Sequence, residues 1–116
     1  MQQKAALGCA LIVEDPMIQR FVGGILKREG YLVIEAELEE ALRTLRDSPD
    51  AVSLLITNLP GHFFEFAETL PLIYVAAFPD PALADGFRRC RVLRKPFRPS
   101  DLALCAAELA PPVLTF

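Results

Sequence analysis

The feature that most constrains the fold is an uninterrupted apolar run near the start of the chain. The run extends from Ala5 to Val13 without alternation, and the acids Glu14 and Asp15 follow it directly. A strand that faces solvent on one side alternates apolar and polar residues, whereas a strand buried on both faces of a parallel sheet does not. The run therefore predicts a buried parallel strand, and it is too short to cross a membrane.

The rest of the chain alternates between strand-like and helix-like segments. Apolar residues at helical spacing separate short runs of β-favouring residues, with glycine or proline signals between them. Strands are predicted over 5–13, 31–35, 53–57, 72–76 and 92–93, and helices over 16–29, 38–45, 82–89 and 102–109. This order requires right-handed crossovers and a parallel sheet covered on both faces. The predicted fold class is α/β, a flavodoxin-like doubly wound five-stranded parallel sheet.

Composition excludes several classes of protein. A chain of 116 residues fits one domain, 1–116, and a hydrophobic share of 53% excludes intrinsic disorder. The net charge of −3 has the wrong sign for a domain that binds nucleic acid. Cys9, Cys90 and Cys105 form no CxxC pair and predict buried thiols in a reducing compartment. We therefore expect a cytoplasmic protein with no nucleic-acid or membrane partner.

Five segments carry a resemblance to a known family. They occur in the order LIVEDP, GYLVIEAELEEALRTL, LLITNLPG, LIYVAAFPD and VLRKPFRPSDL. In that order, and over nearly the whole chain, they resemble the receiver domain of response regulators in two-component signalling. The resemblance implies a (βα)5 fold with a functional site at the carboxyl ends of the strands.

Part of the family's site matches this sequence. The resemblance implies that Glu14 and Asp15 correspond to the acidic pair that holds Mg²⁺, a cation that prefers hard oxygen ligands. Lys95 matches the lysine that pairs with the phosphoryl group, and Pro96 stands where the family commonly has a cis peptide bond. With only two carboxylates left, the expected metal site is residual and weak, and no other cofactor is expected.

Three positions depart from the family's pattern. Asn58 stands at the position of the phosphoacceptor aspartate, and its neutral amide oxygen is a far poorer nucleophile than a carboxylate. Ala76 stands at the position of the hydroxyl that binds the phosphoryl oxygens, and Val92 at the position of the aromatic switch. The resemblance therefore implies a degenerate form of the receiver domain.

Simpler interpretations of the retained residues stay open. Asp15 before Pro16 also has the pattern of a helix N-cap followed by proline at the first helical position. Lys95 could brace the rim by pairing with Asp15, without any chemistry. The single histidine, His62, is expected to be a solvated loop residue.

The third helix of the family is shortened here. Only the ten residues from His62 to Pro71 separate Pro60-Gly61 from the next strand, which leaves room for about two turns. Phe63, Phe64 and Phe66 are crowded into this short element as candidates for a partner surface, and a core position is the equal alternative. The segment 111–116, which begins with two prolines, predicts an extended tail.

A basic run precedes the last helix. It places six positive charges in eleven residues with no acid among them: Arg88, Arg89, Arg91, Arg94, Lys95 and Arg98. Such a run either docks an acidic partner or forms a solvated face, and in most proteins a run of this kind is a solvated face.

Together these features favour an atypical stand-alone receiver domain that is not an enzyme. We expect a phosphorylation-independent interaction module whose partner is a histidine kinase, another regulator or a second copy of the chain. Two alternatives stay open, a working phosphoreceiver with another acceptor residue and a small-ligand-binding flavodoxin-like domain. The second lacks a glycine-rich phosphate loop after the first strand.

Overall fold

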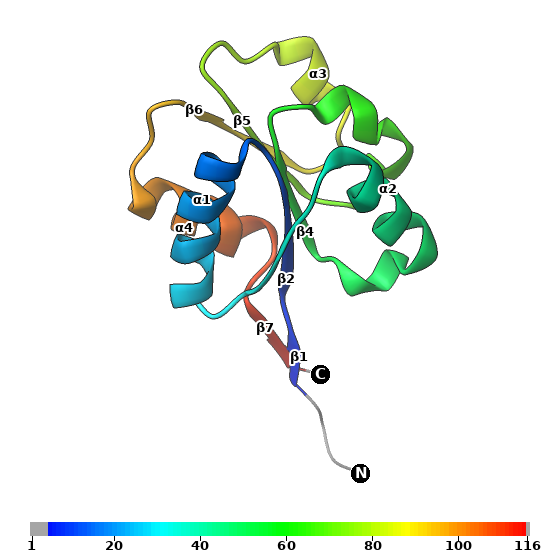
Figure 1. Ribbon diagram of the computed structural model, residues 1–116, viewed down its shortest axis with the longest axis vertical. Helices are drawn as coiled ribbons and strands as arrows, with labels where there is room; N and C mark the ends of the chain where they lie inside the picture. Colours follow the sequence, from blue (N-terminus) through cyan, green and yellow to red (C-terminus); the bar gives the residue numbers. More distant parts are fainter. Residues whose placement is uncertain (1–4, 116) are drawn as a thin grey trace.

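A five-stranded parallel sheet forms the centre of the molecule. The computed structural model describes the backbone of residues 5–115 and the side chains of residues 8–112. The sheet has the strand order β3-β2-β4-β5-β6 (Figure 1), and its strands are β2 (Cys9–Val13), β3 (Leu32–Glu35), β4 (Leu54–Thr57), β5 (Leu72–Ala76) and β6 (Cys90–Arg94). All four pairings are parallel, which confirms the predicted flavodoxin-like, doubly wound fold class.

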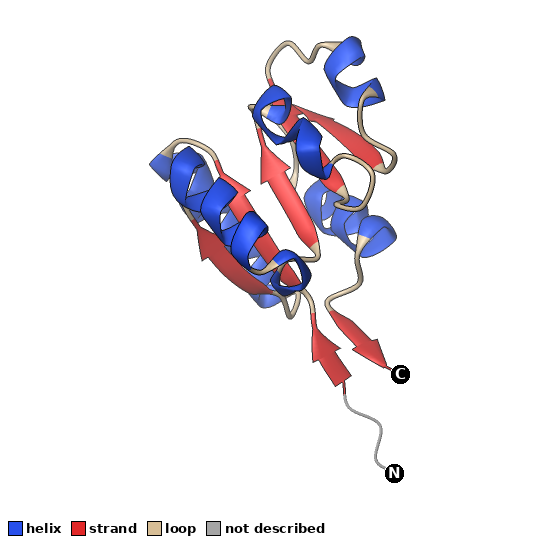
Figure 2. Cartoon of the chain, turned by 90° about the vertical axis from the view of Figure 1, so that its right-hand side faces the viewer, coloured by secondary structure: helices blue, strands red, loops and turns tan. Residues whose placement is uncertain are grey.

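Helices cover both faces of this sheet. On one face lie α1 (Pro16–Arg28) and α4 (Pro99–Leu109), and on the other lie α2 (Leu38–Asp47) and α3 (Pro81–Asp85), as Figures 1 and 2 show. Successive residues of a strand point to opposite faces, so Ile12 packs under α1 while Leu11 packs under α2. Both neighbours are fully buried, which explains why the first run of the sequence does not alternate.

A 3-10 helix, η2 (Pro60–Phe66), replaces the third helix, and it follows a shorter one, η1 (Pro49–Ala51). With three residues per turn, Phe63 and Phe66 lie on the same side of η2 and pack into the core. Phe63 is fully buried and Phe66 is half-buried. The prediction that Phe63 belongs to a partner surface is therefore wrong, because the turn of η2 directs its side chain into the core.

Phe64 lies on the outer side of η2. Its side chain is 45% exposed, and its ring lies against Phe87 at a centroid distance of 5.8 Å. Gly86 allows this approach, because a Cβ at that position would meet the Phe64 ring at 2.7 Å. Of the three phenylalanines, only Phe64 stays a strong candidate for contact with a partner.

A small two-stranded ribbon extends from the body of the molecule. β1 (Ala5–Leu7) and β7 (Val113–Thr115) pair antiparallel at the end where both termini lie (Figure 2). Gly8 separates β1 from β2, where a Cβ would meet the carbonyl oxygen of Pro111 at 2.8 Å. The single strand predicted over 5–13 is thus divided, and the extended tail contains a strand; Phe116 lies outside the described residues.

The last crossover is short. The helix predicted over 82–89 is α3, which begins one residue earlier at Pro81 and ends at Asp85, and Asp80 caps its start. The chain then enters β6, the edge strand beside β5. Among residues 5–115 there is no helix of the length and apolar character that a membrane crossing requires.

Candidate functional site

Four strands of the sheet end at one rim, where the chain places most of the candidate residues. Glu14 follows β2, Asn58 follows β4, Ala76 ends β5, and Lys95 follows β6. Parallel strands bring their carboxyl ends together, and ligands of this fold class bind outside that rim. The topology thus brings these four residues to one rim, and their functional roles stay predictions.

Glu14 and Lys95 form an ion pair across this rim. The Nζ atom of Lys95 lies 3.0 Å from Oε2 and 3.2 Å from Oε1 of Glu14. The side chain of Glu14 is fully shielded from solvent, and that of Lys95 is 26% exposed. A carboxylate withdrawn from water needs such a partner. The sequence-based pairing of Lys95 with Asp15 is wrong, because the neighbouring Glu14 faces the lysine.

Asp15 instead caps α1. Its Oδ1 atom accepts hydrogen bonds from the backbone N–H groups of Met17 at 3.1 Å and Ile18 at 3.2 Å. Pro16 occupies the first helical position, where its missing N–H costs nothing. This geometry favours the capping interpretation of Asp15, which its exposed position on the rim also fits.

The described rim does not fit Mg²⁺ well. Both carboxylates of the acidic pair are already engaged, one by Lys95 and one by the start of α1. Nowhere between residues 5 and 115 do three His, Cys, Asp or Glu side chains form a cluster that could hold a metal ion. Weak Mg²⁺ binding at Glu14 and Asp15 stays a prediction, and no chemistry is derived from it.

Asn58 and Ala76 lie at the rim as the fold requires. Asn58 is exposed directly after the buried strand β4, and Ala76 is half-buried. The carbonyl oxygen of Ala76 accepts a hydrogen bond from the backbone N–H of Lys95 at 2.9 Å, which fixes the end of β5 against the end of β6. The Lys95-Pro96 peptide bond that follows is cis.

Two residues that the sequence analysis missed hold the rim together. The buried hydroxyl of Thr57 donates to the carbonyl of Val13 at 2.8 Å and accepts from the N–H of Leu59 at 3.0 Å. It thereby fixes where the chain turns toward Asn58. A hydroxyl in an otherwise apolar strand was the signal that could have identified it.

Gln19 performs a similar task between α1 and the sheet. Its Nε2 atom donates to the carbonyl oxygens of Ile12 at 3.0 Å and Ala36 at 2.9 Å. These two carbonyls lie near the ends of β2 and β3, so one amide joins a helix to two strands. A polar residue beside the apolar face of a predicted helix was its only sequence signal.

An apolar hollow of about 550 Å³ lies beside Lys95. Its lining consists of Ile18, Phe21, Ala77, Lys95, Pro96 and Phe97. The rings of Phe21 and Phe97 lie 5.9 Å apart, and Phe21 is half-exposed. Lys95 is the one ionisable side chain in this lining, so the hollow offers apolar contact area and little to hold a phosphoryl group.

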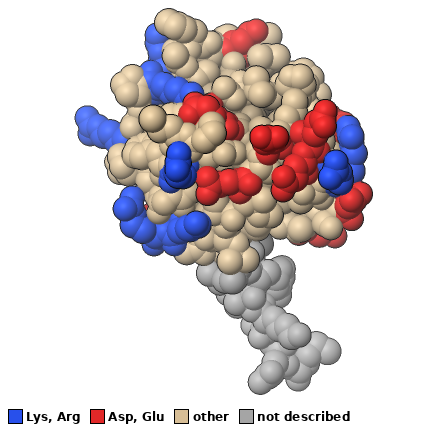
Figure 3. Space-filling view, viewed as in Figure 1, with Lys and Arg blue, Asp and Glu red and all other residues tan. Residues whose placement is uncertain are grey.

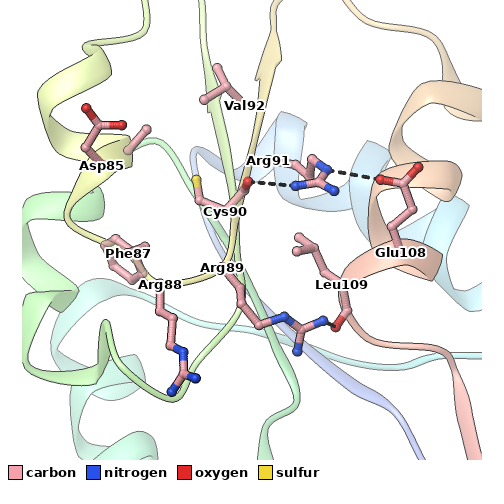
Figure 4. A pocket seen from close by; sticks show the side chains of 10 residues that line it. Asp85, Phe87, Arg88, Arg89, Cys90, Arg91, Val92, Glu108 and Leu109 are labelled. Carbon is pink, nitrogen blue, oxygen red and sulfur yellow. Dashed lines mark hydrogen bonds and ion pairs between the residues drawn. The ribbon is translucent and has the colours of Figure 1, made fainter.

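The basic run is dispersed over the edge of the sheet. Arg91 pairs with Glu108 of α4 at 3.0 Å, and the side chains of Arg89 and Arg94 donate to the carbonyls of Leu109 and Ala77. On the face shown in Figure 3, Lys and Arg gather on the side where α1, α4 and β6 lie, and Figure 4 shows three arginines of the run around a hollow at β6. The run is therefore partly solvated and partly structural.

The cysteines differ in burial. Cys9 is buried, as predicted, whereas Cys90 and Cys105 are half-buried. Burial raises the pKa of all three thiols above the usual value for cysteine. A raised pKa leaves little thiolate at neutral pH, so none of the three has the electrostatic environment of a reactive cysteine.

Similarity of this chain to known proteins is detected in its structure and not in its sequence. No family model matches the sequence, and no curated protein matches it either. Among solved structures, the chain is similar to a response regulator receiver domain protein of Clostridium thermocellum, with a TM-score of 0.74, 20% identity, and coverage of 89% of this chain and 94% of that one.

Two further structures have the same fold. The chemotaxis protein CheY4 of Vibrio cholerae gives a TM-score of 0.70 at 20% identity, over 90% of this chain and 99% of that one. The receiver domain of the hybrid histidine kinase CckA gives 0.68 at 24% identity, over 88% and 98%. The chain therefore has the fold of response-regulator receiver domains.

Proposed function

We propose that this chain is an atypical receiver module of two-component signalling, which binds protein partners without accepting a phosphoryl group and has no enzymatic activity. The observation that supports it most directly is Asn58 at the end of β4, where the receiver resemblance requires an aspartate. An amide oxygen carries no charge and does not form an acyl phosphate under conditions in which a carboxylate does.

The surroundings of Asn58 support the same proposal. Ala76 offers no hydroxyl to a transferring phosphoryl group, and its carbonyl is engaged by the backbone of Lys95. The ammonium group of Lys95 neutralises Glu14, whose side chain is fully shielded from solvent. Recruiting Lys95 to an incoming phosphoryl group would leave that carboxylate buried without a partner, at a substantial cost in free energy.

The exposed apolar side chains near the rim favour a protein partner. Met17 is 75% exposed and Phe78 is 87% exposed, and both lie in segments that follow carboxyl ends of strands. Together with the hollow around Phe21, they are typical of a contact surface. The proposed partners are a histidine kinase, another regulator or a second copy of this chain, and the proposed location is the cytoplasm.

The central test is phosphoryl labelling. The protein is incubated with acetyl phosphate and Mg²⁺, and its intact mass is measured beside the variants Asn58→Asp and Asn58→Asp/Ala76→Thr. We expect no mass gain in the natural sequence. The double variant restores both the carboxylate and the hydroxyl, and it is the matched control that shows whether this fold can accept a phosphoryl group once they are present.

A stoichiometric phosphorylated species of the natural sequence would refute the proposal and favour the alternative of a working receiver with another acceptor. Magnesium binding is tested separately by calorimetry. Micromolar affinity that is lost in Asp15→Ala would contradict the expected weak site.

A further inference from the structure

The edge of β6 has backbone groups that point away from the sheet. Within the described part of the chain, β6 pairs only with β5. Leu72 N–H donates to the carbonyl of Arg89, and Lys95 N–H donates to that of Ala76, so the odd-numbered residues of β6 face β5. Backbone groups alternate along a strand, and the N–H and C=O groups of Val92 therefore point outward. The outward carbonyl of Cys90 accepts a hydrogen bond from the side chain of Arg91 at 3.3 Å, so Val92 offers the accessible pair of backbone groups.

This edge lies at the bottom of an open hollow of about 450 Å³. Asp85 and Phe87, at and just after α3, lie on one side of β6, and Glu108 and Leu109 of α4 lie on the other (Figure 4). Val92 itself is 45% exposed between these two sides. An extended polypeptide could thus reach the edge without displacing a helix.

The charge around the hollow is positive. Its lining contains three arginines, Arg88, Arg89 and Arg91, and two acids, Asp85 and Glu108. Arg94 adds a further positive charge on the same strand. The net charge of the whole chain has the opposite sign, at −3. On the face of the molecule that Figure 3 shows, most acidic groups lie on the side of α2, away from β6.

The charge decides which kind of segment fits. A second copy that used its own β6 would bring its own Arg91 and Arg94, with Arg88 and Arg89 just before the strand, to the same edge, and like charges across paired strands are destabilising. An acidic segment gains electrostatic attraction instead and still satisfies the outward N–H and C=O groups.

We propose that the edge of β6 binds an extended acidic segment of a partner protein, which adds to the sheet as a sixth strand. Acidic side chains on one face of that segment meet Arg91, replacing its exposed pair with Glu108, and approach Arg89, which also donates to the carbonyl of Leu109. A small apolar side chain on the other face meets Val92. This inference rests on the proposed function in assuming a protein partner, and it names that partner's chemistry. A negative result in the peptide test below would overturn this inference without affecting the phosphoryl-labelling test, and the reverse also holds.

The probe is a short synthetic peptide of alternating glutamate and valine, labelled with a fluorophore and titrated with the full chain at low salt. Its control is the same peptide with lysine in place of glutamate. We expect saturable binding of the acidic peptide alone, weakening as salt is added. Amide hydrogen exchange should slow at Val92 and not at Val33, which lies at the opposite edge.

Two variants separate strand addition from simple charge attraction. Val92→Pro removes an outward N–H and leaves the bonds between β6 and β5 intact, because edge positions tolerate proline. Its matched control is Val33→Pro, at the opposite edge of the sheet. The backbone N–H groups of Leu32 and Ala36 donate to the carbonyls of Gly8 and Ile12, so the N–H of Val33 points away from β2 and outward too. We expect Val92→Pro to weaken binding about tenfold, as the loss of one hydrogen bond does, and Val33→Pro to leave it unchanged.

Arg91→Glu is expected to weaken binding by a further order of magnitude or more, because it reverses a charge beside the peptide. Should Val92→Pro fail to fold, a peptide N-methylated at every second residue replaces it and should bind at least tenfold more weakly. Absence of binding by the acidic peptide overturns the proposal. Equal binding by Val92→Pro and Val33→Pro, or unchanged exchange at Val92, also overturns it in favour of diffuse charge attraction.

Discussion

The two ends of the parallel sheet are held together by different kinds of interaction. At the amino end the cross-links are hydrogen bonds to backbone groups. The hydroxyl of Tyr31 donates to the carbonyl of Ala110 at 2.6 Å, Ser53 exchanges two hydrogen bonds with the backbone of Cys9, and the guanidinium of Arg89 donates to the carbonyl of Leu109. At the carboxyl end, the side-chain contact that joins the residues farthest apart in the sequence is the ion pair between Glu14 and Lys95.

This difference bears on function. A rim that binds a charged ligand needs charged groups that are free to meet the ligand, whereas here Glu14, Lys95 and Asp15 each already have a partner within the chain. The charges at the carboxyl-end rim thus hold the end of the sheet together, a role that the amino end fulfils without a buried ion pair. The following variants test whether that role is structural.

The largest effect is expected for Lys95→Met. It leaves the Glu14 carboxylate buried without its partner, and the free energy of unfolding should fall by about 2–3 kcal/mol, less than for a fully buried pair because water reaches the partly exposed site. The measurement is urea denaturation at neutral pH. The double variant Glu14→Leu/Lys95→Met should recover most of the loss. If it is as unstable as the single variant, the pair is not what holds the rim.

Thr57→Val tests the neutral part of the same rim. The two side chains have nearly the same shape, but the carbonyl of Val13 and the N–H of Leu59 lose their hydrogen-bond partner. The free energy of unfolding should therefore fall by about 1–2 kcal/mol. Ser53→Ala is the comparison at the amino end. An unchanged denaturation midpoint for Thr57→Val would mean that water replaces the hydroxyl without loss.

Tyr31→Phe addresses the amino end and its pH dependence. Removal of the buried hydroxyl should cost about 1 kcal/mol at neutral pH. Burial, reinforced by the negative charge of Glu29, raises the pKa of Tyr31 from 10.0 to about 12. The unfolded chain therefore releases this proton first, and the contribution of Tyr31 to stability is fully present below pH 10 and is lost between about pH 10 and 12. The slope of stability against pH in that range should be shallower in Tyr31→Phe; equal slopes would assign it to another group.

The smallest effect is expected away from both ends. Arg46 of α2 and Glu65 of η2 form an exposed pair, with Nε and Oε2 3.1 Å apart. The hydrogen bond from Arg46 lowers the pKa of Glu65, so any contribution would be present at neutral pH and lost in acid. Because solvent and salt screen such pairs, Glu65→Gln should leave the thermal midpoint unchanged within error. A clear drop would show that a surface pair matters as much as the rim.

The sheet was predictable because its strands leave a strong pattern. A run that is apolar on both faces, followed by helical spacing and the next run, permits few topologies, and the rim residues then follow from where the strands end. Phe63 was harder, because whether an aromatic residue faces inward depends on whether η2 turns every three residues or every 3.6.

The partners at the rim were not predictable for a similar reason. Glu14 and Asp15 are neighbours with the same charge, and only the direction in which each side chain leaves the backbone decides which meets Lys95. The hydrogen bonds of Gln19 depend on the distance between α1 and two strand ends. The sequence shows no such distances, and the pairing of β1 with β7 joins segments from opposite ends of the chain.

That pairing has a consequence for the order of folding. Bringing the first and last strands together closes a loop that contains the whole domain, and a flexible chain pays a large entropy cost to close such a loop before its interior is ordered. Once the sheet and its helices have formed, Gly8 and Pro112 are already adjacent and the hydrogen bond between them costs little. The ribbon should therefore form last and open first, as a local event that leaves the body folded.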